Sequence, residues 1–340
     1  MKMSERIADI FLEREEQTLS PFAFLTKNTK GREHPYVPCK NRTEFQRDRD
    51  RIIHSKSFRR LMHKTQVFLS PTDEHYRTRM THTLEVTQVA RIIARALCLN
   101  EDLTEAAAMG HDLGHTPFGH AGESAMQKCY SPEFTHYRQG IRVVEKLEHD
   151  GAGLNLTYEV RDGILHHTGE SLASTLEGVI VKFADRIAYI NHDIDDAIRA
   201  GILHIDDIPK ELTDVLGKGH SERINRMVTS VITASTNQPE IKFTDEIGDA
   251  TMKLRKFLFE NVYTNPIAKS EDNKAQELLA RLFEYYVKQP NEMPELYFRN
   301  TKNEPVERCV CDFISSMTDR FAINRYSELF IPEVWRGKQL

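Results

Sequence analysis

Residues 110–123 read GHDLGHTPFGHAGE, which places three histidines and two carboxylates within one short stretch. A helical pattern leads into this stretch and ends at about His111, because Gly114 and Pro117 both interrupt helices. A single histidine is usually structural, but three of them beside Asp112 are hard to explain by packing alone. His111 and His115 share a face if the helix persists, and His111 and Asp112 converge on one ion where it ends. The stretch therefore predicts a divalent-cation site at a helix end.

Two further polar residues stand where a helix would normally place apolar ones. His82 begins a predicted helix over 81–97, and Asp185 lies in the middle of another over 174–199. An aspartate in mid-helix is unfavourable by propensity and costly when it is buried without a partner. A metal removes that cost, and imidazole with carboxylate suits Mn, Fe, Co, Ni or Zn better than Mg. We therefore expect His82 and Asp185 to complete the cation site.

Helical periodicity dominates the rest of the chain, so we predict an all-α protein. Strand signals are scarce and weak, and the better ones lie at 241–243 and 306–310. Ser4 is a candidate cap for a short N-terminal helix that turns Ile7 and Ile10 inward. Further helical patterns cover residues 47–68 and 100–111, and broken helices follow Gly201.

The composition is that of an ordinary globular chain, with 39% hydrophobic residues, 29% charged residues and a net charge of -5. It contains no apolar run long enough to span a bilayer and no signal-peptide core, so we expect a cytoplasmic protein without a membrane partner. The five cysteines follow no zinc-ribbon spacing, which favours reduced thiols. Between Lys40 and Lys64 the sequence contains nine Lys or Arg but only three acidic residues. This basic block indicates a locally held anion or, more simply, a solvated face with ion pairs.

The order His82, His111-Asp112, Asp185 is similar to the H…HD…D ligand order of the HD-domain phosphohydrolases. The flanking segments resemble more narrowly the deoxyguanosinetriphosphate triphosphohydrolases, and the resemblance runs from about residue 20 to about residue 330. It implies an HD-domain helical core with additional C-terminal helices. The segments that carry it are 48–54, 58–61, 64–68, 79–82, 110–120 and 312–321.

The resemblance also implies a division of the chain into three parts. Residues 1–45 would form an N-terminal helix and loop, and residues 46–200 the metal-dependent phosphohydrolase core. Residues 201–340 would form a helical part that closes the site and supports oligomer contacts.

The family hydrolyses a deoxynucleoside triphosphate to the deoxynucleoside and inorganic tripolyphosphate, with water attacking the α-phosphorus. The resemblance implies one divalent ion per site (Mn, Fe, Mg, Co or Ni), held by the four ligands named above. It gives His115 and His120 catalytic positions, and it makes His120 the proton-transfer residue, with Glu123 orienting it at i, i+3 spacing. The roles of acid, base and nucleophile all stay open for His120.

The substrate contacts that the resemblance implies lie on several segments. Asp185, Tyr189 and Asp193 recur every four residues on one helix face, and the family's Tyr and second Asp meet the sugar. Gln66 matches a position that touches the 3′-hydroxyl, and Arg79 matches one that binds phosphate. Arg186 follows the expected metal ligand Asp185 and is a second candidate for binding phosphate. His136 fits the place of a further family histidine. The pair His166-His167 resembles a family segment without an assigned role.

Several alternatives stay open at this point. A dGTP substrate is the favoured expectation, but some relatives accept all four dNTPs and need a dNTP effector. Family members assemble as hexamers or tetramers, and part of the family binds single-stranded DNA, for which the basic block would be the place. The rival functions are another HD phosphohydrolase, acting on cyclic nucleotides or (p)ppGpp, and a regulator that binds nucleotides or single-stranded DNA.

Overall fold

The structure is a computed structural model that describes residues 6–66 and 77–332, without the side chains of residues 266–270. Within these residues the chain is helical and holds no strand, only the isolated bridges Arg32–Thr157 and Thr65–Thr78. The all-α prediction is therefore confirmed. No helix in the described part is long and apolar enough to cross a membrane. The helices are α1 Ile7–Thr18, α2 Glu44–Ile53, α3 Lys56–Arg60, α4 Arg79–Ala96, α5 Glu101–Gly110, α6 Gly119–Cys129, α7 His136–Arg142, α8 Tyr158–Leu165, α9 Leu176–Arg199, α10 Lys210–Leu216, α11 His220–Ser235, α12 Asp245–Leu258, α13 Pro266–Lys288, α14 Glu295–Asn300, α15 Val306–Ser316 and α16 Asp319–Phe330.

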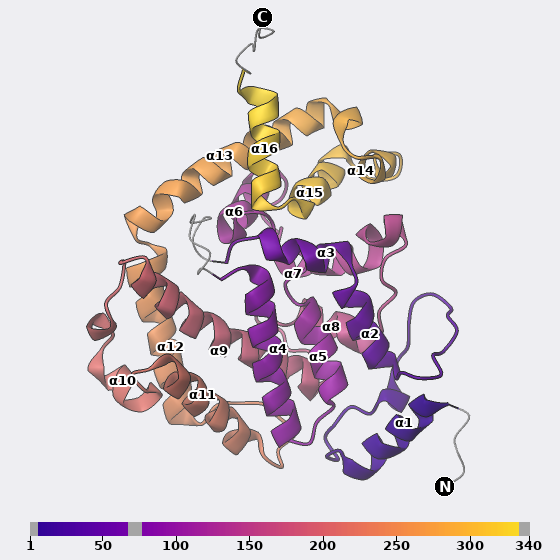
Figure 1. Ribbon diagram of the computed structural model, residues 1–340, viewed down its shortest axis with the longest axis vertical. Helices are drawn as coiled ribbons and strands as arrows, with labels where there is room; N and C mark the ends of the chain where they lie inside the picture. The colour runs from indigo at the N-terminus through magenta and orange to yellow at the C-terminus, as the bar shows by residue number, and fades with distance from the viewer. Residues whose placement is uncertain (1–5, 67–76, 333–340) are drawn as a thin grey trace, which may run out of the picture.

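Helices α4, α5 and α9 pack against one another at the centre of the molecule (Figure 1). Each begins at a residue whose side chain accepts a hydrogen bond from a backbone N–H of the first turn, namely Thr78, Asn100 and Thr175. Their apolar faces join one core that includes Val86, Ile93 and Ile187, all fully buried. These caps and this core fix where each helix starts, and therefore where the side chains at its ends are placed.

The C-terminal half packs onto this centre from two sides (Figure 1). Helices α10, α11 and α12 lie beside α9 and share its apolar core, while α13 to α16 gather at the other end of the molecule. There α13 contacts α6, and a second apolar core joins residues of α2 and α6 with residues of α13 and α15. The helices near residues 110–130 are thus held by segments from both ends of the chain.

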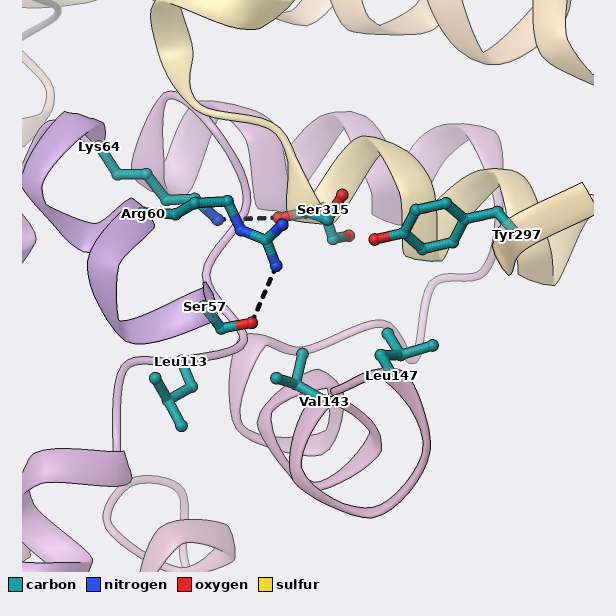
Figure 2. A pocket seen from close by; sticks show the side chains of 9 residues that line it. Ser57, Arg60, Lys64, Leu113, Val143, Leu147, Tyr297 and Ser315 are labelled. Atoms are coloured by element: carbon teal, nitrogen blue, oxygen red, sulfur yellow. Dashed lines mark hydrogen bonds between the residues drawn. The ribbon is translucent and has the colours of Figure 1, made fainter. Parts of the chain in front are cut away.

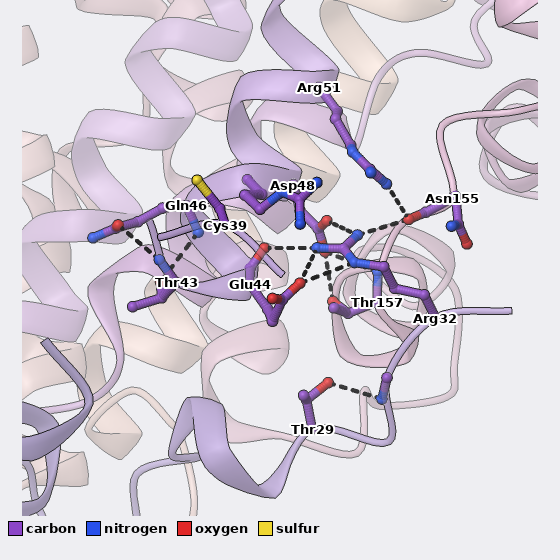
Figure 3. Close-up of polar contacts among 12 residues, drawn as sticks. Thr29, Arg32, Cys39, Thr43, Glu44, Gln46, Asp48, Arg51, Asn155 and Thr157 are labelled. Atoms are coloured by element: carbon purple, nitrogen blue, oxygen red, sulfur yellow. Dashed lines mark hydrogen bonds and ion pairs between the residues drawn. The ribbon is translucent and has the colours of Figure 1, made fainter. Parts of the chain in front are cut away.

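A buried ion-pair network holds the loop before α2 (Figure 3). The Arg32 guanidinium pairs with Glu44 at 2.7 Å and with Asp48, and both Arg32 and Asp48 are fully buried side chains. Asp48 also accepts from the backbone N–H of Thr157 at 2.8 Å and from its hydroxyl at 2.6 Å. Much of the basic block is used in the same way: Arg49, for instance, pairs with Asp50 and Glu105. These contacts agree with the simpler interpretation of the block.

Two local predictions were wrong, and the weak strand signals mark no strand. The signal at 306–310 lies in helix α15, because Val306 and Val310 are spaced four residues apart and share one helix face. Residues 241–243 form no strand, and the predicted helix 47–68 divides at Ser55, which caps α3 by accepting from Phe58 N–H. In α1, Ile7 and Ile10 are exposed and Ala8 is the buried residue. The proposed cap Ser4 lies outside the described residues.

Candidate active site

The stretch 110–123 forms the end of α5, a buried loop and the first turn of α6. Helix α5 stops at Gly110, and the chain turns back through Gly114, where a Cβ atom would lie 2.1 Å from both Gly140 N and His136 O. Only glycine allows this close approach of the loop to α7. At the far end Phe118 takes a left-handed conformation (φ 60°) and donates its N–H to Asp319 at 2.9 Å. The loop is therefore fixed by α7 on one side and by α16 on the other.

The four predicted metal ligands come together at the meeting point of α4, α5 and α9. The ligand atoms of His82, His111 and Asp112 all lie within 4.8 Å of one another. Asp185 Oδ1 lies 3.1 Å from His82 Nε2 and 3.9 Å from His111 Nε2. His82 sits in the first turn of α4, His111 and Asp112 follow the end of α5, and Asp185 comes from α9. Residues more than a hundred positions apart thus surround one small volume.

The hydrogen bonds of His111 show that this volume suits a cation. Its Nδ1 lies 2.6 Å from the Ala108 carbonyl oxygen, which only accepts, so Nδ1 carries a proton. Its Nε2 is buried and has no hydrogen-bond partner among the described residues. The same nitrogen lies 3.5 Å from Asp112 Oδ1. A buried nitrogen lone pair between two carboxylates is what a divalent ion with imidazole and carboxylate ligands requires.

Both carboxylates of the cluster are held in their ionised form. Burial raises the pKa of Asp185, but the hydrogen bond from His82 and the charges of the nearby histidines outweigh it, and the pKa falls to about 2. Burial also opposes ionisation of Asp112, yet His115, His111 and Arg79 bring its pKa well below the usual value. Two anionic ligands therefore persist at neutral pH.

Behind His82 lies a pair of residues that the sequence analysis missed. The His82 Nδ1 atom is 3.2 Å from His192 Nδ1, and His192 Nε2 is 2.7 Å from the Glu85 carboxylate. Since the carboxylate only accepts, His192 Nε2 carries a proton, and His192 Nδ1 accepts a hydrogen bond from His82 Nδ1. This arrangement turns the Nε2 atom of His82 toward Asp185 Oδ1, which lies 3.1 Å away. The available signal was the single histidine of the Asp185 helix, one residue before Asp193.

The predicted catalytic histidines adjoin the metal ligands. His115 Nε2 lies 3.2 Å from Asp112 Oδ1, and burial together with the charges of Arg79 and His136 brings the His115 pKa well below its usual value. Its ring stacks on His136 with centroids 4.0 Å apart and planes 14° apart. His120, in the first turn of α6, is exposed and meets the His115 ring edge-on at 6.2 Å. His115 therefore lies next to Asp112 and contacts two further imidazoles, those of His136 and of the exposed His120.

Glu123 orients His136, which corrects the expectation that it orients His120. One Glu123 oxygen accepts from the His136 backbone N–H at 3.1 Å, and the other lies 3.0 Å from the ring Nδ1. The close approach of α6 to the start of α7 decides this pairing, which helical spacing alone did not reveal. Burial raises the pKa of Glu123, but the contacts with His136, followed by the charge of His120, bring it below its usual value.

Two candidate substrate contacts, Arg79 for the phosphate and Gln66 for the sugar, have buried polar atoms without partners in the described part of the chain. Arg79 donates to Asp112 Oδ2 at 3.0 Å and is 2% exposed, but its Nε and Nη2 atoms have no acceptor. Gln66 likewise has a buried Oε1 without a donor. An unsatisfied buried guanidinium favours an anionic ligand beside the metal ligands. Arg186 lies elsewhere on α9, lining an open hollow of about 260 Å³ with Asp245 and Asp249.

The candidate sugar site is completed by a residue that the sequence analysis did not identify. The Tyr263 hydroxyl donates to Asp193 Oδ2, while Asp193 Oδ1 is buried without a partner among the described residues. Burial raises the pKa of Asp193 to about 7. Burial also raises the pKa of Tyr189, one turn away. Tyr263 ends a π-helical turn, Phe259–Tyr263, that follows α12, and no pattern in the sequence linked it to α9.

A small pocket lies beside the loop that carries His115, between α5 and α6 (Figure 2). Lys64 is 3% exposed and donates to the carbonyl oxygens of His115 and Ser315, the latter at 2.8 Å. Burial lowers its pKa to about 7. Arg60, on the same side of the pocket as Lys64, donates to the Ser57 hydroxyl at 2.9 Å. Lys64 thus ties the His115 loop to α15, which is a structural use for one member of the basic block.

Comparison with known proteins agrees with this geometry. The HD domain family matches residues 79–190, which include all four candidate ligands, and the phosphohydrolase-associated domain family matches residues 241–328. A deoxyguanosinetriphosphate triphosphohydrolase-like protein of Caldanaerobacter subterraneus subsp. tengcongensis is 53% identical over 330 residues, covering 97% of each chain. Proteins of the same name from Desulfatibacillum aliphaticivorans and Clostridium perfringens strain SM101 are 49% and 47% identical, covering 96% and 98% of this chain and 98% and 99% of theirs. The chain therefore belongs to the deoxyguanosinetriphosphate triphosphohydrolase-like family of metal-dependent HD-domain phosphohydrolases.

Proposed function

We propose that this protein hydrolyses deoxynucleoside triphosphates, with dGTP as the first candidate, to the deoxynucleoside and inorganic tripolyphosphate. The observation that carries the proposal is the buried Arg79 guanidinium. It is fixed to the metal ligand Asp112 at 3.0 Å and has two donors without an acceptor among the described residues. A phosphate oxygen that contacts Arg79 would therefore lie next to the ion held by His82, His111, Asp112 and Asp185. That is where a phosphorus atom must sit to be attacked.

The chain's own residues supply the remaining functions. A bound Mn, Fe, Mg, Co or Ni ion would polarise the α-phosphate and lower the pKa of a bound water. Arg79 neutralises negative charge on the phosphate, and Gln66 is proposed as a contact to the sugar 3′-hydroxyl. His115 and His120 lie between Asp112 and solvent and transfer the proton that the departing 5′ oxygen needs. Glu123 holds His136 against His115.

We assign the binding of the nucleoside part of the substrate to later turns of α9, the helix that carries Asp185. Asp193 has one carboxylate oxygen fixed by Tyr263 and one buried oxygen free to accept from a sugar hydroxyl. Tyr189 lies one helical turn closer to the metal ligand and packs against the sugar, which disfavours a 2′-hydroxyl there. Tyr263 comes from the part after residue 200, which supports a role for residues 201–340 in closing the site over the core at 46–200.

Further aspects of the proposal concern partners. A dNTP effector, a hexameric or tetrameric assembly, single-stranded DNA binding at the basic block and a cytoplasmic location are proposed by resemblance to the family.

A product assay tests the reaction. The protein would be incubated with Mn²⁺ and each dNTP, alone and in pairs, and the products separated by chromatography. We expect tripolyphosphate and deoxynucleoside, abolished in His111→Ala and retained in His166→Ala, whose residue contacts Asp162 and not the metal ligands. Incubation with single dNTPs reports base preference, and incubation with pairs reports whether one dNTP activates the hydrolysis of another. Absence of tripolyphosphate under every pairing would refute the proposal, and cyclic nucleotides and (p)ppGpp would then be tested.

A further inference from the structure

The small pocket beside the His115 loop has a positively charged lining (Figure 2). Two cations, Lys64 and Arg60, line it, and no carboxylate of the described residues does. The other lining side chains either carry a hydroxyl group, as Tyr297 and Ser315 do, or are apolar. The free volume is about 10 Å³, which is room for one molecule or ion of about the size of water. The pocket therefore offers positive charge and hydrogen-bond donors to one small occupant.

Lys64 contributes a buried charge that the protein satisfies only in part. Its side chain is 3% exposed, and its ammonium group donates to the carbonyl oxygens of His115 and Ser315. An ammonium group has three N–H bonds, so one donor is left without an acceptor in the described part of the chain. Carbonyl oxygens carry no net charge that would offset the ammonium. Burial and the charge of Arg60 accordingly lower the pKa of Lys64 to about 7.

The carboxylates near the pocket are bonded to other groups. Glu148 accepts three hydrogen bonds from the first two residues of α3, at 3.1, 2.7 and 2.6 Å, and lies 3.9 Å from the Arg60 guanidinium. Asp319 and Asp112 attract the charge of Lys64, but their oxygens accept hydrogen bonds from other residues. A buried charge without a close partner of opposite sign is costly. An anion in the pocket would remove that cost.

Further donors surround the same volume. Arg60 is partly exposed and uses one nitrogen on the Ser57 hydroxyl, at 2.9 Å, which leaves its other N–H groups available. The Tyr297 hydroxyl points into the pocket from α14 (Figure 2). The Ser315 hydroxyl is buried near the weakly accepting thiol of Cys311 and makes no hydrogen bond to a described residue. Donors from separate parts of the chain therefore meet at this pocket.

We propose that the pocket binds one small monovalent anion of the size of chloride, held by Lys64, Arg60 and Tyr297. The ion would offset the Lys64 ammonium and accept the hydrogen bonds that the protein leaves unmade. A phosphate or a carboxylate needs more room than about 10 Å³. Because Lys64 joins the His115 carbonyl to the end of α15, the bound ion stabilises the loop that carries His115. The inference is independent of the proposed reaction.

The first test is heat unfolding at constant ionic strength, in sodium gluconate and in mixtures where chloride or bromide replaces about 100 mM of the gluconate. We expect either halide to raise the midpoint of unfolding by about 2 °C or more. The rise should disappear in Lys64→Met and in Arg60→Gln, and the second variant stays informative if the first does not fold, because Arg60 is partly exposed. Arg59→Gln is the matched control and should keep the full rise, since Arg59 is exposed and donates to the His54 carbonyl.

The second test locates the ion. Crystals of the protein soaked in sodium bromide should show an anomalous bromine peak between Lys64 and Tyr297, and crystals of Arg60→Gln should not. A wild-type midpoint that does not respond to halide, or a pocket that holds only water in bromide, refutes the proposal. A halide response that is equal in the wild type and in Arg60→Gln indicates an adventitious ion only and refutes it too. Neither test measures hydrolysis, so either failure leaves the proposed function standing.

Discussion

Asp319 connects the last helix of the chain to both sides of the candidate site, and its removal is the sharpest stability prediction. One carboxylate oxygen accepts from the backbone N–H and the hydroxyl of Thr65, at 3.0 Å and 2.8 Å, and the other accepts from Phe118 N–H at 2.9 Å. Thr65 precedes Gln66, and Phe118 precedes the helix that carries His120. Asp319 is 4% exposed, so water replaces these hydrogen bonds poorly.

The magnitude follows from the groups left without a partner. Asp319→Ala leaves the buried N–H of Phe118 unsatisfied, which costs about 1–3 kcal/mol, and removes charged hydrogen bonds to Thr65 worth about 1.5 kcal/mol or more. We therefore expect the free energy of unfolding to fall by about 3 kcal/mol. Asp319→Asn keeps one accepting oxygen and should lose about half as much.

The assay is urea unfolding followed by circular dichroism, with Arg320→Ala as the matched control at the next, exposed position of α16. That control should stay within about 0.5 kcal/mol of the wild type. In the proposed reaction we also expect kcat to fall in Asp319→Asn, because the His120 turn is no longer held. A loss below about 0.5 kcal/mol in Asp319→Ala would show that the three hydrogen bonds do not hold the loop, and would refute the reasoning.

Three further predictions follow from the site and its surroundings. His192→Phe removes the acceptor behind His82 and should weaken Mn²⁺ binding about 10-fold to 100-fold. The control Gln88→Ala changes an exposed residue of α4 and should leave the Mn²⁺ dissociation constant unchanged. An unchanged dissociation constant in His192→Phe would contradict the role of His192 in orienting His82. Burial raises the pKa of Glu177 to about 7, so its contribution to stability is greatest below about pH 4.5 and is lost as the pH rises through about 7. Glu177→Gln keeps the oxygen that accepts from two backbone N–H groups. Its free energy of unfolding should exceed that of the wild type by about 1–3 kcal/mol at pH 8 and should equal it at pH 4.5. Calorimetry that finds the same difference at both pH values would contradict this. Arg79→Lys should raise KM for the triphosphate and lower kcat, because one ammonium cannot bind Asp112 and phosphate together as a guanidinium does, and unchanged steady-state constants would remove Arg79 from the phosphate site.

Local patterns in the sequence were sufficient for the secondary structure at the site. A helix was predicted over 100–111, and the structure shows Asn100 at the start of α5 accepting from Leu103 N–H at 3.2 Å. A pattern with two interpretations decided less, as at 306–310, where the same apolar spacing gives a weak strand signal and also fits one helix face. The choice between them depended on burial against α13, which the segment itself does not encode.

The sequence by itself determined the all-α class, the family, and the residues His82, His111, Asp112 and Asp185 as a candidate set, because polar residues at unusual helix positions are visible in a linear pattern. The tertiary structure decided which of these residues touch and through which atoms. It directed Glu123 to His136 instead of His120, placed His192 behind His82, brought Tyr263 to Asp193 and set His136 against His167. Each of these contacts joins different helices or helical turns, and its formation depends on how they pack. The direction of a side chain at such a meeting point is fixed by close packing and hydrogen bonding across helices, for which the spacing along one helix carries no information.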